Sequence, residues 1–162
     1  MRNYTVEDIR KIKWKDIKDV GFQEREKLGR TIFASIAINS DYEFTKGKYD
    51  SWDVSGTADT YTYNAEIKYR YILRDKYDKV GYWLEKEKYD ALMDAYKETK
   101  SIPYFITFVR NGVGYCWNLL KLEPVWKKER ATASSANGTY KKGEKEKLVY
   151  HPLPREGKEL KW

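Results

Sequence analysis

Cysteine and histidine are almost absent from this chain. Cys116 and His151 are the single residues of their kinds among 162. One cysteine excludes an intrachain disulfide and a cysteine zinc cluster, and it fits a reducing, cytoplasmic environment such as that of a bacterium or a phage-infected cell. A Ser-His-Asp or Cys-His site would have to use His151, and no Gly-x-Ser-x-Gly or catalytic-cysteine context supports one.

Long apolar runs are also missing. No stretch of about 18 apolar residues occurs, which excludes a membrane span, and the first residues lack the apolar core of a signal peptide. Aromatic residues are not scarce: they make up 16% of the chain, which argues against wholesale disorder. The net charge of +7 comes from 32 basic and 25 acidic residues. That balance favours a polyanionic partner such as nucleic acid, although a well-solvated surface explains it as well.

The pattern of apolar residues predicts a mixed α/β chain. A short amphipathic helix is expected within residues 1–20, and a stronger helix over 22–38. β-rich pieces at 42–44 and 49–54 and a returning run at 61–73 flank a Gly-containing turn and predict a hairpin. A further amphipathic helix is expected over 84–99, followed by strands at 104–109 and 115–119 around an Asn-Gly turn.

The second run of the hairpin holds the most informative feature. Side chains alternate between the two faces of a strand, so Glu66 and Lys68 share one face while Ala65, Ile67 and Tyr69 share the other. An acid and a lysine two residues apart can present a metal ligand and a cation to the same phosphate. The sequence therefore predicts a metal-dependent phosphodiesterase site on this strand.

The order helix, strand, turn, strand with Glu-x-Lys, helix, strand, turn, strand resembles that of the PD-(D/E)XK nuclease superfamily. This group includes restriction endonucleases, phage exonucleases and junction resolvases. The resemblance covers roughly residues 22–120. It implies a restriction-endonuclease-like α/β fold with a mixed sheet of about five strands flanked by helices.

The family pattern places an aspartate on the first hairpin strand, and here two aspartates are available. If the turn centres near Ala58, then Asp50 lies opposite Glu66 and Asp53 lies opposite Tyr63. Because directly opposed residues are close enough to share a cation, Asp50 is favoured and Asp53 is the alternate. Tyr49 stands where the family has a proline, which is a departure from its pattern.

The resemblance also implies the cofactor and the role of each residue. Asp50 and Glu66 would bind Mg²⁺ or Mn²⁺ through hard oxygen ligands. The backbone carbonyl of Ile67 would add a ligand. Either Glu24 or Glu26 on the preceding helix is a weaker candidate, and Glu24 is slightly preferred. Lys68 would steer or deprotonate the attacking water and stabilise charge on the phosphate. A solvated strand face with a weak Glu-Lys ion pair is the alternative reading of the motif.

Basic residues outside the motif are candidates for nucleic-acid contacts. Arg70 shares the strand face of Lys68, and the clusters at Lys127-Lys128 and Lys141-Lys142 could hold a phosphate backbone or belong to a mobile solubilising segment. We expect residues 1–126 to form the nuclease-like domain with its N-terminal helix. Residues 127–162 would be a basic C-terminal extension or a hairpin of that domain.

The favoured function is metal-dependent cleavage of DNA, or less readily RNA, by an endo- or exonuclease. Two alternatives remain open. One is a non-catalytic nucleic-acid-binding module on the same fold, and the other is a structural or assembly protein that uses its many Tyr and Trp residues at a subunit interface. The small size of the chain points to a homodimer or a protein partner.

Overall fold

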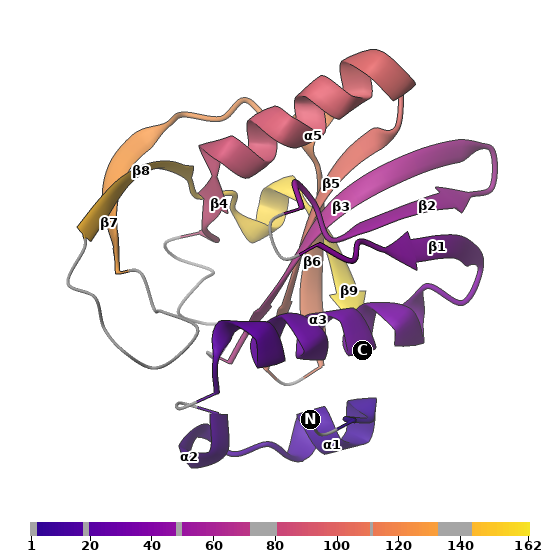
Figure 1. Cartoon of the computed structure of the whole chain (residues 1–162), viewed down its shortest axis with the longest axis vertical. Helices are drawn as coiled ribbons and strands as arrows, with labels where there is room; N and C mark the ends of the chain where they lie inside the picture. The colour runs from indigo at the N-terminus through magenta and orange to yellow at the C-terminus, as the bar shows by residue number, and fades with distance from the viewer. Residues whose placement is uncertain (1–2, 18–19, 48–49, 72–80, 111, 133–143) are drawn as a thin grey trace.

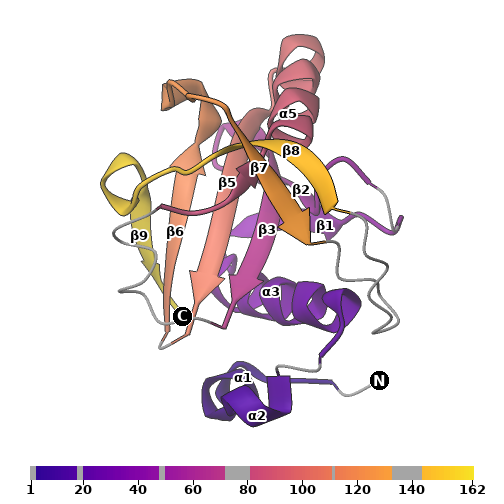
Figure 2. The same cartoon turned by 90° about the vertical axis from the view of Figure 1, so that its left-hand side faces the viewer.

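The structure is a computed structural model that describes residues 3–17, 20–47, 50–71, 81–110, 112–132 and 144–162. Two sheets and the two long helices, α3 and α5, form layers (Figures 1 and 2). A six-stranded mixed sheet lies in the middle, with helix α3 on one face, and with helix α5 and a three-stranded sheet on the other. In chain order the elements are α1 (Val6–Lys11), α2 (Trp14–Ile17), α3 (Phe22–Ile36), β1 (Ser40–Phe44), β2 (Val54–Ala58), β3 (Tyr61–Arg70), β4 (Leu84–Glu85), α5 (Lys86–Thr99), β5 (Ile102–Val109), β6 (Val113–Asn118), η1 (Leu119–Lys121), β7 (Lys127–Thr132), β8 (Glu144–Tyr150), η2 (Pro154–Glu156) and β9 (Lys158–Lys161).

The main sheet has the strand order β1-β2-β3-β5-β6-β9. All its neighbours are antiparallel except β3 and β5, which run parallel. Parallel neighbours need a crossover connection, and α5 lies in that connection. The α/β prediction with its mixed sheet and flanking helices is confirmed. The sheet has one strand more than the expected five, because β9 from the C-terminal end adds to β6.

Helix α3 forms because its apolar residues recur at helical spacing and meet one face of the sheet. Leu28 and Ile32 are buried in the same cluster as Ala65, Ile67 and Tyr69 of β3. Contact is close at Gly29, where an added Cβ would lie 3.0 Å from Ile67 Cγ2. The expected helix over 22–38 is therefore present and ends two residues early, at Ile36.

The expected alternation of β3 is also present. Its odd-numbered residues from Tyr63 to Tyr69 belong to the apolar cluster under α3. Glu66 and Lys68 consequently project from the opposite face, toward α5, where Phe105 and Leu92 belong to the second apolar cluster. The motif thus lies on the side of the sheet that α5 and the smaller sheet cover.

The predicted hairpin register is wrong by three positions. Ala58 pairs with Tyr61, and Val54 pairs with Ala65, so the turn is formed by Asp59 and Thr60 rather than centred on Ala58. Asp59 has φ of 48°, a left-handed conformation that aspartate tolerates and that short hairpin turns require. Tyr63 therefore lies opposite Gly56 and not opposite Asp53.

One further region, near the N-terminus, departs from the sequence expectations. The N-terminal segment contains the two short helices α1 and α2 in place of one helix. The C-terminal region supplies β7 and β8, which pair antiparallel with Lys127 opposite Val149, and β8 also pairs with β4. Lys141 and Lys142 lie outside the described residues. Among the helices that are described, none has the length and apolar character needed to cross a membrane.

Candidate active site on strand β3

Glu66 is a carboxylate in the interior of the protein. Only 1% of its side chain is exposed. Oε1 forms an ion pair with the ammonium of Lys68, and Oε2 lies 3.2 Å from Nζ of Lys88 on α5. Burial raises the pKa of Glu66 above its usual range, and the two ammonium groups oppose that rise. The carboxylate is thus held in an apolar setting by positive charge.

Lys68 is the nearest of these cations. Burial favours its neutral form, but the carboxylates of Glu66 and Asp53 outweigh burial and raise the pKa of Lys68 above its ordinary value. The side chain is therefore an ammonium ion at neutral pH. In this state it can stabilise negative charge on a phosphate, whereas a role as a proton acceptor would require it to lose its proton first.

Asp53 is the second buried acid, with 7% of the residue exposed. Its backbone N–H donates to the carbonyl of Ala65 at 3.0 Å, which continues the β2–β3 ladder by one residue. Its side-chain Oδ2 accepts from the backbone N–H of Ile67 at 2.7 Å. These two bonds hold the Asp53 carboxylate beside the strand that carries Glu66 and Lys68.

Arg30 of α3 completes the surroundings of Asp53. Its Nη2 lies 3.6 Å from Asp53 Oδ1 and 2.7 Å from Glu26 Oε1. Its Nη1 donates to the carbonyl of Thr45 at 2.8 Å, which ties the loop before β2 to the helix. Glu26, one helical turn before Arg30, therefore reaches the site through the guanidinium group.

The structure brings Asp53, Glu66 and Lys68 together. Asp50 is exposed, and its Oδ2 accepts a 2.7 Å hydrogen bond from the backbone N–H of Gly47 in its own loop. Only the backbone of Asp50 reaches the site, where its carbonyl accepts from Lys88 Nζ at 2.9 Å.

The other expected ligands are placed as follows. The N–H of Ile67 points at Asp53, and the carbonyl of a strand residue points to the same side as its N–H, so the Ile67 carbonyl faces the Asp53 side as well. Glu24 is half-buried on α3, and within the described residues no hydrogen bond or ion pair joins it to Asp53 or Glu66.

The expected nucleic-acid contacts lie around this face. Arg70 is half-buried on the same face of β3 as Lys68. Lys127 and Lys128 are exposed on β7, in the smaller sheet on the α5 side of the molecule (Figure 2).

Sequence reasoning missed Lys88 and Arg30. Neither belongs to the Glu-x-Lys pattern, and each comes from a helix rather than from the motif strand. The sole sequence signal for Lys88 is its place in the first turns of the helix that follows the motif strand.

The donor set fits a hard divalent cation. Two carboxylates and a carbonyl supply oxygen ligands, the kind that Mg²⁺ and Mn²⁺ prefer. Both carboxylate oxygens of Glu66 are buried, and each is paired with an ammonium group. A cation next to this carboxylate is therefore electrostatically favourable. Over the described part of the chain no three Asp, Glu, His or Cys side chains gather at one point. The protein would therefore supply two acids, and water or substrate the remaining ligands.

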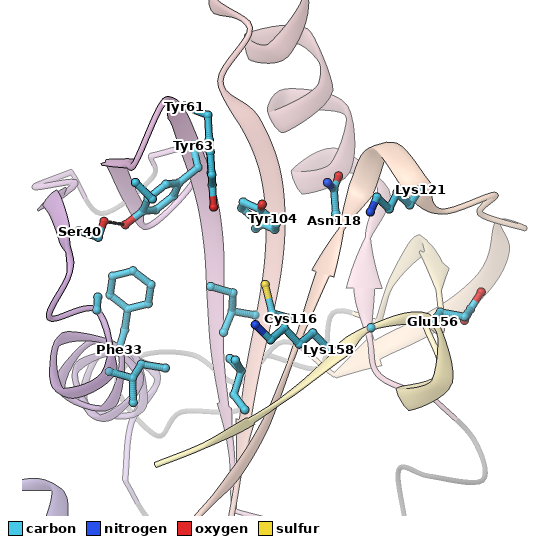
Figure 3. Close-up of a pocket in the computed structure, with 16 residues that line it drawn as sticks. Phe33, Ser40, Tyr61, Tyr63, Tyr104, Cys116, Asn118, Lys121, Glu156 and Lys158 are labelled. Atoms are coloured by element: carbon cyan, nitrogen blue, oxygen red, sulfur yellow. Dashed lines mark hydrogen bonds between the residues drawn. The ribbon is translucent and has the colours of Figure 1, made fainter.

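A separate hollow of about 550 Å³ lies on the opposite face of the sheet, next to α3. Figure 3 shows Tyr61, Tyr63 and Tyr104 along one part of it, and Cys116 and Lys158 along another. The hydroxyl groups of Tyr63 and Ser40 are 2.7 Å apart and form a hydrogen bond. Because the sheet separates this hollow from Glu66, it is not part of the acid-lysine site.

Comparison with known proteins identifies the fold. No family model matches the sequence, and no curated protein matches it significantly. The structure is similar to the 1.6 Å structure of Hjc, a Holliday junction resolvase from the hyperthermophilic archaeon Archaeoglobus fulgidus. The TM-score is 0.50 at 9% identity, and the match covers 80% of this chain and 93% of the resolvase.

The class that these findings define is the restriction-endonuclease-like fold. Junction resolvases are one of the groups in the superfamily that the sequence resembles, so the resemblance to PD-(D/E)XK nucleases is confirmed at the level of the fold.

Proposed function

We propose that this chain is a metal-dependent nuclease that cleaves phosphodiester bonds in DNA. One observation supports the proposal above all: on the strand where this fold has its acid-x-lysine motif, the structure brings together two buried carboxylates, Asp53 and Glu66, and the ammonium of Lys68. The likeness to a Holliday junction resolvase favours DNA as the substrate.

The residues of the site have distinct roles in this proposal. Asp53, Glu66 and the Ile67 carbonyl would hold Mg²⁺ or Mn²⁺, which when bound makes water a better nucleophile and neutralises phosphate charge. Lys68 stabilises the negative charge that builds up on the phosphate during attack. The Asp53 carboxylate is fixed in place by the Ile67 N–H, so it needs no reorganisation to act as a ligand.

Arg70, Lys127 and Lys128 would bind phosphates away from the cleaved bond. Arg70 extends the polar row of β3 beyond Lys68, and the two lysines lie on an exposed strand of the smaller sheet. Such contacts position a nucleic acid without reading its sequence. Action on a junction would suit a homodimer, since two cuts then need two sites.

A cleavage assay tests the proposal. Supercoiled, linear duplex, single-stranded and four-way junction DNA, with RNA as a further substrate, would be incubated with Mg²⁺ or Mn²⁺ and, separately, with EDTA. We expect cleavage only with metal, and a loss of about 100-fold or more in Lys68→Ala, because the charge on the phosphate then lacks its stabilising cation. Asp53→Asn should lose cleavage as well, while Asp50→Asn should keep most of it.

A second function is favoured by the ion pairs themselves. Lys68, Lys88 and Arg30 already neutralise the acids, so the same cluster would be stable in a non-catalytic DNA-binding module. Salt-dependent binding of DNA with no cleavage of any substrate in either metal would support the binding module and contradict the nuclease. Circular dichroism of each variant would establish that the fold is retained.

A further inference from the structure

Lys88 enters the acid site from α5, an element that the Glu-x-Lys motif does not include. Its Nζ lies 3.2 Å from Glu66 Oε2 and donates to the Asp50 carbonyl at 2.9 Å. The side chain thus joins three parts of the fold: the first turns of α5, the motif strand β3 and the loop that precedes β2. Lys88 pairs with Oε2 of Glu66, whereas Lys68 pairs with Oε1.

The ion pairs described around Glu66 balance in charge without a metal. Among the described residues, the ion pairs around Glu66 and Asp53 join three acids (Glu26, Asp53 and Glu66) to three bases (Arg30, Lys68 and Lys88), so the charges of these six side chains, −3 and +3, sum to zero. A buried carboxylate is tolerated only with compensating positive charge, and here the protein supplies that charge itself. A divalent cation bound at Glu66 would leave a surplus of two positive charges in a partly buried site. That surplus repels the cations already present.

Lys88 is the cation best able to leave. Arg30 is anchored to Glu26 at 2.7 Å and to the Thr45 carbonyl at 2.8 Å. Lys68 lies on β3 itself, two residues from Glu66, and only 21% of its side chain is exposed. The Lys88 side chain is 30% exposed, and its second contact is a neutral carbonyl. A long, flexible ammonium with an exposed path can exchange a carboxylate for another anion at little cost.

We propose that Lys88 is a positioning residue that exchanges partners when metal binds: it holds Glu66 in the metal-free protein, is displaced by the metal ion, and then binds a phosphate of the DNA. This inference rests on the proposed nuclease function. It makes metal binding and phosphate binding mutually supportive, because the phosphate accepts the ammonium that the metal releases. It also means that the metal-free protein keeps its buried acids neutralised.

Metal affinity tests the first half of the exchange. Calorimetric titration with Mn²⁺ would compare the unaltered chain, Lys88→Met and the control Lys86→Met. Lys86 lies two residues earlier on α5 and pairs with Asp90 at 2.5 Å, so its removal takes the same charge from the same helix without touching Glu66. We expect Lys88→Met to bind Mn²⁺ about tenfold more tightly than the unaltered chain, since a competing positive charge is gone, and Lys86→Met to bind as the unaltered chain does.

Equal affinities in Lys88→Met and Lys86→Met would overturn the exchange. A different result would contradict the nuclease proposal: Glu66→Gln would bind Mn²⁺ with the same affinity as the unaltered chain. If the unaltered chain binds no Mn²⁺ but Lys88→Met does, the competition is supported directly. If neither binds, the exchange is rejected together with the metal site. Should Lys88→Met fail to fold by circular dichroism, Lys88→Gln offers the same loss of charge.

DNA affinity tests the second half. Binding of duplex or junction DNA would be measured at several salt concentrations under two conditions, with Ca²⁺ in place of Mg²⁺ and with EDTA. In Ca²⁺ we expect Lys88→Met to reduce the dependence of log K on log salt by about 0.9, the value of one lost phosphate contact. In EDTA we expect no change, because Lys88 is then held by Glu66. An equal effect in both conditions would show that Lys88 contacts DNA regardless of metal and would contradict the exchange.

Discussion

Asp50 and Asp53 carry the same side-chain group and lie three residues apart, yet their carboxylates are in different environments. The carboxylate of Asp53 is buried and accepts from the Ile67 N–H, while that of Asp50 is exposed and accepts from the Gly47 N–H. A buried carboxylate beside Glu66 can share a cation with it. An exposed one in a loop has water as a competing partner.

This difference predicts unequal effects of two matched substitutions. We expect Asp53→Asn to weaken Mn²⁺ binding at least about tenfold, since a ligand and its negative charge are lost together. Asp50→Asn should change the affinity little. Calorimetry on both variants measures the contrast directly. If Asp50→Asn weakens binding more than Asp53→Asn does, then Asp50 is the first ligand. That result would agree with the hairpin register that was assumed from the sequence.

Cys116 gives a prediction about pH. Burial raises the pKa of its thiol to about 12, although the residue borders the hollow on the α3 face (Figure 3). The thiolate is the reactive form, and a raised pKa means that less of it exists at any pH below that value. At pH 8 we expect iodoacetamide to modify Cys116 about 100-fold more slowly in the folded protein than in urea, because the loss of thiolate is partly offset by the greater nucleophilicity of a thiolate of higher pKa. The folded rate should still be rising with pH at pH 10, where an ordinary thiol has levelled off.

Among the elements, helix α3 and strand β3 were predictable because their patterns are local. Leu28 and Ile32 repeat at helical spacing, and β3 alternates between an apolar and a polar face, so burial of one face settles both elements. The placement of Glu66 and Lys68 on the polar face followed from that alternation alone.

The hairpin register was not predictable in the same way. It depends on which residue adopts the left-handed conformation, and Asp59 does so although Gly56 is the residue most free to do it. Gly56 is instead a strand residue opposite Tyr63. Glycine is required there because an added Cβ would collide with the Tyr63 ring. That contact between two strands is invisible until the strands are paired. Strand β9 is similarly set by its pairing with β6 rather than by its own polar sequence.

The end of α5 provides a test at this scale. The helix ends at Thr99, and Lys100 adopts φ of 60°, where glycine is favoured and a side chain is strained. We expect Lys100→Gly to raise the free energy of unfolding by about 0.5 kcal/mol, since relief of strain exceeds the added entropy of the unfolded chain. Lys100→Ala, which keeps the Cβ, should not stabilise. Urea denaturation measures both, and equal values for Gly and Ala would contradict the argument.

At the scale of the whole molecule, the acid site is assembled from segments that lie far apart in sequence. Arg30 comes from α3, Asp53 from the approach to β2, Glu66 and Lys68 from β3, and Lys88 from α5. The sequence predicted the two residues that share a strand and named Asp53 as the alternate acid. Arg30 and Lys88 depend on how the packing of α3 and the crossover through α5 bring these helices against the sheet, and no local pattern encodes that.

The charge of the molecule gives the last prediction. Lys127 and Lys128 are exposed on β7, which belongs to the smaller sheet on the same side of the main sheet as Glu66 and α5 (Figure 2). Lys11 and Lys13 are exposed beside α1, on the far side of the main sheet below α3 (Figure 1). Changing either pair to Gln lowers the net charge equally, from +7 to +5. If only net charge mattered, both variants would lose the same affinity for DNA.

We expect them to differ, because counterions are released only where lysines meet phosphates. Lys127→Gln/Lys128→Gln should reduce the salt dependence of log K by about 1.8, the value of two lost contacts, while Lys11→Gln/Lys13→Gln should leave it nearly unchanged. Fluorescence anisotropy with a labelled duplex at several salt concentrations measures both slopes. Equal slopes in the two variants would mean that DNA is attracted by the overall charge, and that the β7 strand makes no contact of its own.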